Sequence, residues 1–181
     1  MTTLPTWDLF ITLFFIMSLG YGLILGRQKI VVAFISCYIG YAISMVVGES
    51  IYNVLTGGSL ISEIWVKSNI SAFGVKSLLF FIIAVVVSLK GEIGVIPGRF
   101  AEGGKGAIFT AIYSFLTAGL IIASLISFLN PAEQQLFLQQ SHLAQQIVNY
   151  YNLWFLGPVI LMVSIGLIKD GSWTNKILIK Y

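Results

Sequence analysis

Residues that could do chemistry are few in this chain and lie far apart. The sequence holds one histidine, one cysteine and seven acidic residues among 181. His142 lies among glutamines and Cys37 within an apolar run, so neither has a neighbour that would activate it as a base or a nucleophile. No cluster of histidine, cysteine and carboxylate side chains has metal-ligand spacing. The residues therefore predict no catalytic residue, no metal site and no cofactor.

Lys76 is the one ionisable residue that we expect to intrude into the membrane. A lysine near a helix end can extend its head to the interface while its stem stays in the apolar layer. The other interpretation is a buried charge pair with Glu49 or Glu63, in an aqueous vestibule. The first makes Lys76 dispensable, and the second makes it functional.

The composition of the chain shows in which environment these residues must be positioned. The chain is 57% hydrophobic and 9% charged, whereas soluble domains carry about 25% charged residues. The mean hydropathy is +0.94. These values exclude a disordered chain, a nucleic-acid binder and an ordinary cytosolic enzyme, and they make the lipid bilayer the main partner of the protein.

Apolar runs predict a single all-α transmembrane domain over residues 1–181. A helix needs about 20 residues to cross the hydrocarbon core. The runs do not alternate as the strands of a barrel would, so we expect helices. The five expected spans cover residues 9–25, 30–47, 72–89, 107–129 and 151–168.

Two of the links carry helix-start signals of their own. Ser59 can cap a short helix bearing Leu60, Ile61, Ile64 and Trp65. Asn130, Pro131 and Glu133 form a stronger start signal. The sequence there predicts an amphipathic helix over residues 131–149 that lies on the membrane, with Leu136, Leu143 and Ile147 on one face.

Basic residues sort the links into two sides. Eight of the ten fall on one side if all five segments cross: Arg27, Lys29, Lys90, Arg99, Lys105, Lys169, Lys176 and Lys180. The positive-inside rule then predicts that these eight residues are cytoplasmic, with the N-terminus outside and the C-terminus in the cytoplasm. The tryptophans Trp7, Trp65, Trp154 and Trp173 fall near predicted interfaces, as aromatic belts prefer.

Small residues recur every four positions in three of the spans. The rows are Ser18, Gly22 and Gly26; Ser36, Gly40, Ser44 and Gly48; and Gly119, Ala123 and Ser127. Such rows let helix backbones approach closely in lipid. They indicate either packing inside the bundle or an interface with a second copy or other membrane subunits. Opposite the second row we expect Phe34, Ile35 and Met45 to face lipid or a looser contact.

With these features in view, the chain resembles the colicin V production (CvpA-like) family of small bacterial inner-membrane proteins. The resemblance spans roughly residues 7–150. It rests on Asp8 before an apolar helix, on Gly22 and Gly26 leading into Arg27, on the partly apolar and glycine-rich links, and on the run 141–143, Ser-His-Leu. The chain departs from the family at Gly98, at Phe109 and Thr110, and in its fifth span. The resemblance implies a role in export or envelope function without a defined chemistry.

Two functions from different classes remain open at this point. The first is a non-enzymatic membrane component, a subunit of a complex that supports secretion or envelope function. The second is a small-molecule transport protein, such as the substrate-binding subunit of a vitamin transporter. An aromatic or polar cluster at membrane depth would favour transport, and a dry bundle with an exposed face of small residues would favour a subunit. An intramembrane enzyme lacks candidate residues.

Overall fold

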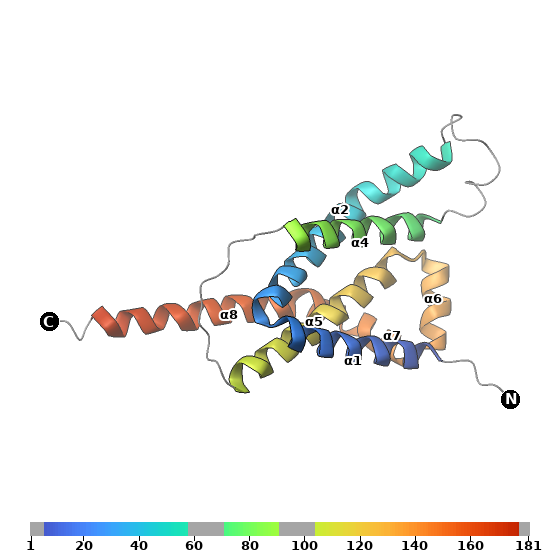
Figure 1. Ribbon diagram of the computed structural model, residues 1–181. Coiled ribbons are helices and arrows are strands. Elements are labelled where there is room, and N and C mark those ends of the chain that lie inside the picture. The colour runs from blue at the N-terminus through green and yellow to red at the C-terminus, as the bar shows by residue number, and fades with distance from the viewer. Residues whose placement is uncertain (1–5, 58–70, 91–103, 178–181) are drawn as a thin grey trace.

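Helices make up the regular structure of the described chain. The computed structural model describes residues 6–57, 71–90 and 104–177 (Figure 1). The helices are α1 (Trp7–Leu25), α2 (Arg27–Gly57), α4 (Ala72–Lys90), α5 (Gly104–Phe128), α6 (Pro131–Gln140), α7 (His142–Asn149) and α8 (Tyr151–Ile177). No strand occurs in the described residues, so the predicted all-α class is confirmed.

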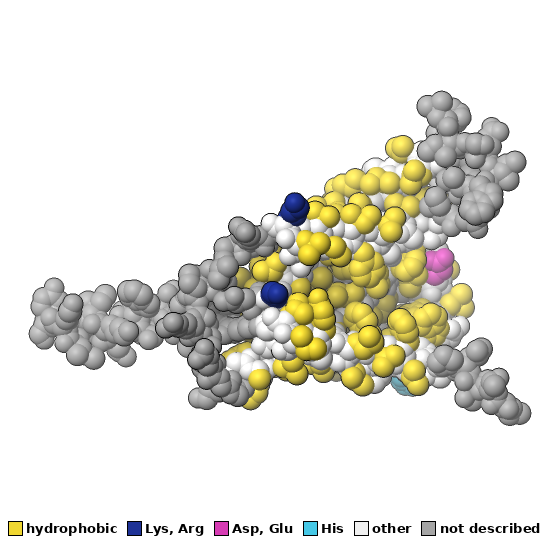
Figure 2. Space-filling model, in the orientation of Figure 1, with side chains coloured by type: hydrophobic (Ala, Val, Ile, Leu, Met, Phe, Trp, Pro, Cys, Tyr) yellow, Lys and Arg dark blue, Asp and Glu magenta, His cyan; other side chains and the backbone are white. Residues whose placement is uncertain are grey.

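Four of these helices are long and apolar enough to cross a membrane: α1, α2, α4 and α5. A fifth crossing is available if α7 and the first part of α8 act as one span, bent by 58° at the break between them. The chain is therefore a multi-pass membrane protein, whose described residues supply four helices, or five with the bent pair, that could serve as crossings. Figure 2 agrees, because hydrophobic side chains cover most of the described surface in view.

The long helices run side by side, so their ends gather at two ends of the bundle (Figure 1). The start of α1, the ends of α2 and α5, and the whole of α6 lie at one end, which we call the α6 end. The turn between α1 and α2, the end of α4 and the start of α5 lie at the other. Helix α8 runs toward that second end and continues past it.

Helix α5 forms the centre of the bundle and contacts α1, α2, α4, α7 and α8. Its buried side chains include Tyr113, Ala118, Leu120, Ala123, Ile126 and Phe128. Small and large residues alternate along it, which lets neighbouring helices come close at some levels and fills the gaps at others. The core therefore follows one central helix rather than one layer.

Most hydroxyl groups of serine and threonine inside the spans donate a hydrogen bond to a backbone carbonyl of their own helix. Ser36 donates to the carbonyl of Val32 at 2.7 Å, and Ser124 donates to that of Leu120 at 2.7 Å. Such bonds to the residue four positions earlier keep a polar side chain paired where no water is at hand. These serines therefore add little polarity to the helix surfaces that pack together.

The segment 131–149 differs from the single surface helix that the sequence predicts. It breaks at Ser141, whose backbone is extended (φ −141°, ψ 117°), and gives α6 and α7. Leu136 is 59% exposed while Ile147 is buried, so the expected apolar face does not exist across the break. The reason is that Ser141 caps α7, accepting from Ala144 N at 3.0 Å, and so ends α6.

Other boundaries and faces also differ from the expected ones. Helix α2 continues to Gly57 rather than ending at residue 47, and α8 continues to Ile177 rather than to 168. Phe34 was expected to face lipid, but it is 2% exposed and belongs to the core. Trp154, which we expect near a membrane interface, is 7% exposed and packs against Gly119 of α5. The short helix expected after Ser59 lies outside the described residues.

Candidate functional site

The row of small residues on α2 faces α4. A Cβ atom added at Gly40 would lie 2.9 Å from the carbonyl oxygen of Phe80, and one at Gly48 would lie 2.6 Å from Cγ of Lys76. Ser36 and Ser44 are buried in the same helix. This row therefore belongs to the interior of the bundle, where α2 and α4 make their closest approach.

The rows on α1 and α5 meet different neighbours. A Cβ at Gly22 would lie 1.7 Å from Oγ of Ser114, and Ser18 donates to the carbonyl of Ser114 at 3.3 Å. Gly26 ends α1 with φ +77° and has open space beside it. On α5, Gly119 receives the ring of Trp154, with Cε3 only 1.9 Å from a built Cβ.

The remaining members of the α5 row are Ala123, which is buried, and Ser127, which is half-buried and donates to the carbonyl of Ser124 at 2.7 Å. The three rows thus meet α4, α5 and α8 separately and do not build one shared face.

Lys76 pairs with Glu49 across the α2–α4 interface, Nζ to Oε2 at 3.3 Å. Its stem lies over Gly48 and its side chain is 16% exposed, whereas that of Glu49 is 71% exposed. The arrangement has features of both sequence-based interpretations. Lys76 pairs with Glu49, as the charge-pair interpretation expects, but its head points to an exposed carboxylate, as the interpretation of a lysine that reaches the interface expects. The alternative partner, Glu63, lies outside the described residues.

A clamp between α1 and the α6–α7 break is the most specific polar arrangement described. The carboxylate of Asp8 accepts from the hydroxyl of Ser141 at 2.5 Å and from the backbone N–H of Leu143 at 3.1 Å. Asp8 thus stands at the start of α7, where free N–H groups and the helix dipole favour an anion. In the sequence, Asp8 only precedes an apolar helix, and nothing there assigns it a partner.

Trp7 makes the second half of the clamp. Its indole N–H donates to Oε1 of Gln140 at 3.0 Å, and its ring meets that of Phe137 edge-on with centroids 5.1 Å apart. The first turn of α1 therefore holds the last turn of α6 and the first turn of α7 together. We call this unit, residues 131–149 with Trp7 and Asp8, the clamped corner.

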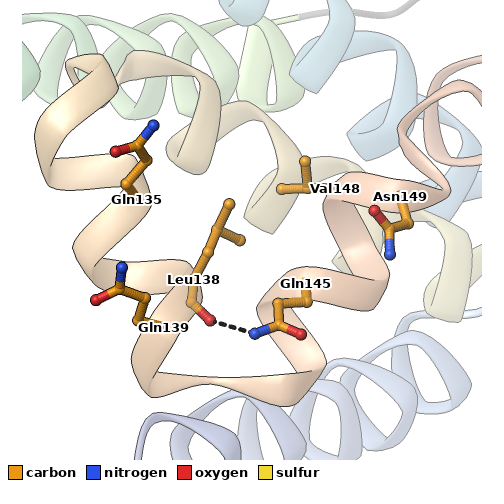
Figure 3. A pocket seen from close by; sticks show the side chains of 6 residues that line it. All are labelled: Gln135, Leu138, Gln139, Gln145, Val148 and Asn149. Carbon is orange, nitrogen blue, oxygen red and sulfur yellow. Dashed lines mark hydrogen bonds between the residues drawn. The ribbon is translucent and has the colours of Figure 1, made fainter.

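The clamped corner encloses an open hollow of about 390 Å³ between α6 and α7 (Figure 3). Three residues of each helix line it: Gln135, Leu138, Gln139, Gln145, Val148 and Asn149. Gln145 donates through Nε2 to the carbonyl of Leu138 at 2.7 Å and so ties the two walls together (Figure 3). The lining carries four side-chain amides and no charge.

An aromatic cluster fills the space where α2, α5 and α8 meet. The hydroxyls of Tyr41 and Tyr151 are hydrogen-bonded at 2.8 Å, and Tyr41 stacks on Phe128 with centroids 5.8 Å apart. Phe155 packs on Tyr41 and Tyr151 with centroids 4.8 and 4.6 Å away. The rings pack directly on one another. The cluster therefore attaches the start of α8 to the core.

Groups for catalysis do not assemble in the described part of the chain. His142 is exposed at the start of α7, and Cys37 is a buried free thiol in α2. No group of three or more histidine, cysteine or acidic side chains that could hold a metal occurs among the described residues. Neither a protein-family model, a curated protein nor a solved structure matches this chain.

The clamp had a partial signal in the sequence. Ser141 before a short apolar-polar helix is a capping pattern, and it falls in the run 141–143 that also carries the CvpA-like resemblance. Nothing in the spacing joins that run to Asp8, which lies 133 residues earlier than Ser141. The glutamines were visible, but their convergence on one hollow depends on the bend at Ser141.

Proposed function

We propose that this protein is a non-enzymatic subunit of a membrane complex that supports secretion or envelope function, and that the clamped corner is its working surface. The observation that carries the proposal is the clamp itself. Two bonds to Asp8, one from Trp7 and one ring contact fix a polar corner at one end of a hydrophobic bundle. A surface held this firmly is suited to presenting groups to a partner without induced ordering.

The resemblance to the CvpA-like family supports the same proposal. Asp8 and the run 141–143 are two of the features on which that resemblance rests, and they meet in the clamp. Their meeting gives the two features a common physical role, which is to join the first and last parts of the similar region. We extend the proposal to a bacterial inner membrane, with the N-terminus outside and the C-terminus in the cytoplasm.

Complementation tests the proposal directly. Cells that lack the protein are supplied with the wild type, with Asp8→Ala, or with Thr12→Val as a control one turn further along α1, where the exposed hydroxyl donates to the backbone carbonyl of Asp8 and not to its carboxylate. We expect Asp8→Ala to insert into the membrane at normal level but to fail in an assay of protein export and of envelope integrity. Wild-type behaviour of Asp8→Ala in both assays would contradict the proposed role of the clamped corner.

Small-molecule transport is the second candidate, and one observation favours it. The α7–α8 pair is bent by 58° beside the aromatic cluster, and broken helices at membrane depth are common at transporter binding sites. The small-residue rows are also internal rather than exposed, which removes one argument for a subunit. Against transport, the rings of the cluster pack on one another. Uptake of labelled vitamins by cells with and without the protein separates the two functions.

A further inference from the structure

The lining of the hollow in the clamped corner is chemically uniform. Gln135, Gln139 and Asn149 are exposed, and their side-chain amides make no hydrogen bond to the described residues, while Gln145 is half-buried and engaged with the carbonyl of Leu138. We infer that this hollow binds a neutral, polyhydroxylated group, a mono- or disaccharide, either on a lipid headgroup or free in solution. The inference rests on the proposed function, since it names the ligand that the clamped corner would bind.

Amide groups match hydroxyl groups in their hydrogen bonding. Each glutamine or asparagine offers two N–H donors and one carbonyl acceptor. A sugar hydroxyl donates one hydrogen bond and accepts others, so neighbouring amides on two walls can each satisfy both of its roles. Three uncommitted amides around one hollow give such a set without any rearrangement of the backbone.

The absence of charge in the lining argues against ionic ligands. Phosphate and carboxylate groups are held in proteins chiefly by arginine and lysine, which can supply charge-assisted hydrogen bonds. None of the six lining residues is basic or acidic. An anionic lipid headgroup or a nucleotide would therefore find no counter-charge in this lining.

The shape and the apolar floor also suit a sugar ring. Leu138 and Val148 contribute apolar surface between the amides (Figure 3). A pyranose has a C–H face that packs on such side chains while its hydroxyls point outward to polar partners. The volume of about 390 Å³ lies within the range of about 300–1,000 Å³ for small-molecule sites.

The two walls are fixed before any ligand arrives. The clamp holds the start of α7 and the end of α6 through Asp8 and Trp7, and the Gln145–Leu138 bond ties the walls near the hinge. Fixed walls of this kind raise affinity because the backbone needs no ordering on binding, and only the exposed amide side chains lose freedom. The hollow also lies at the α6 end of the bundle, where α1 begins and α5 ends (Figure 1), so a bilayer crossed by those two helices would have headgroups near it.

The binding experiment uses the full-length protein and avoids sugar detergents, because an alkyl maltoside would occupy the site. Maltose is titrated calorimetrically onto protein in lauryldimethylamine oxide. Glucosyl-diacylglycerol is offered in phosphatidylcholine nanodiscs, with diacylglycerol and phosphatidylglycerol as headgroup controls, and retention is measured by native mass spectrometry. The double variant Gln135→Leu with Gln139→Leu removes two lining amides, and Gln146→Leu is the matched control, exposed on α7 but not in the lining.

We expect saturable binding of glucosyl-diacylglycerol, unchanged in Gln146→Leu and weakened about 3- to 10-fold for each lining amide removed. Binding of maltose as well would identify the sugar alone as sufficient, and binding of the glycolipid alone would identify a lipid-borne sugar. No saturable binding of either, equal binding by the double variant, or equal retention of phosphatidylglycerol would each overturn the assignment.

Complementation with the same variants separates the two proposals. If Gln135→Leu with Gln139→Leu fails to complement although the wild type binds no sugar, the corner remains the working surface and only the ligand is wrong. If Asp8→Ala and the double variant both complement fully while sugar binding is present, the site binds sugar but the proposed function fails.

Discussion

The carboxylate of Asp8 accepts a 2.5 Å hydrogen bond from the hydroxyl of Ser141 and thereby joins the first turn of α1 to the break between α6 and α7. The same hydroxyl accepts from Ala144 N, and Asp8 also accepts from Leu143 N. One carboxylate and one serine thus end α6, begin α7 and attach both to α1. At this bend the N–H of Leu143 is taken up by Asp8 and that of Ala144 by Ser141, so neither is left unpaired where the helix is interrupted.

Removing the Asp8 carboxylate should loosen the clamped corner before it affects the bundle. We expect Asp8→Ala to speed amide hydrogen exchange across residues 141–149 at least several-fold, with exchange in α5 unchanged, because α5 is buried independently of the clamp. Asp8→Asn keeps an acceptor oxygen and should lie between the two. Exchange in 141–149 that is equal in the wild type and in Asp8→Ala would contradict the clamp.

Gly40 tests the close approach of α2 and α4. A methyl group there would meet the backbone carbonyl of Phe80 at 2.9 Å, which cannot move aside as a side chain would. Gly40→Ala should therefore lower the free energy of unfolding by about 1–3 kcal/mol, as overpacking does.

Gly20→Ala is the matched control for that variant. Gly20 lies on α1 with nothing within 4 Å of a built Cβ, so alanine there should be neutral or stabilise by up to about 1 kcal/mol. Thermal unfolding in detergent compares the two variants, and equal melting temperatures would refute the packing of the α2 row against α4.

The Lys76–Glu49 pair should matter little for stability. The 3.3 Å ion pair has one partner that is 71% exposed, and exposed pairs contribute about 0–1 kcal/mol. Lys76→Met keeps the stem that covers Gly48, so it should unfold within about 1 kcal/mol of the wild type. Glu49→Gln should match it. A folded Lys76→Met protein that has lost function would instead make the pair part of a working site.

The hydroxyl pair of Tyr41 and Tyr151 should show strong coupling. Tyr151→Phe leaves the Tyr41 hydroxyl without its partner in the core, which should cost about 1–3 kcal/mol. The double replacement Tyr41→Phe with Tyr151→Phe removes both polar groups and should cost less than the sum of the single replacements. A double-mutant cycle from chemical denaturation measures this, and strict additivity would argue against the bond.

Topology can be tested by reporters placed at two positions. We expect a fusion after residue 181 and an insertion within residues 132–149 to report opposite sides of the membrane, because the α7–α8 pair would complete a fifth crossing. The fusion at 181 should report the cytoplasm. Both reporters on one side would leave four crossings, with α7 and α8 on the surface or re-entrant.

The amino-acid sequence by itself determined the membrane class, the helical architecture and the approximate positions of the long helices. The reason is that the bilayer requires runs of about 20 apolar residues with internally bonded backbones, and this requirement is local. The positions of Gly40 and Gly48 likewise marked a close approach, because only small side chains permit one. The spacing of the row did not reveal which helix packs against it, and the structure shows that this helix is α4.

Only the tertiary structure decided which faces meet and where polar groups converge. In a membrane protein, hydrophobic side chains face lipid as well as the core, so the hydropathy of Phe34 or Trp154 could not reveal that both are buried. The break at Ser141 carries a local cap, but its attachment to Asp8, 133 positions away, is a contact that no local helix signal encodes, and the sequence predicted one helix where two exist. The amide-lined hollow follows from that break, because the bend brings three residues of α6 opposite three of α7.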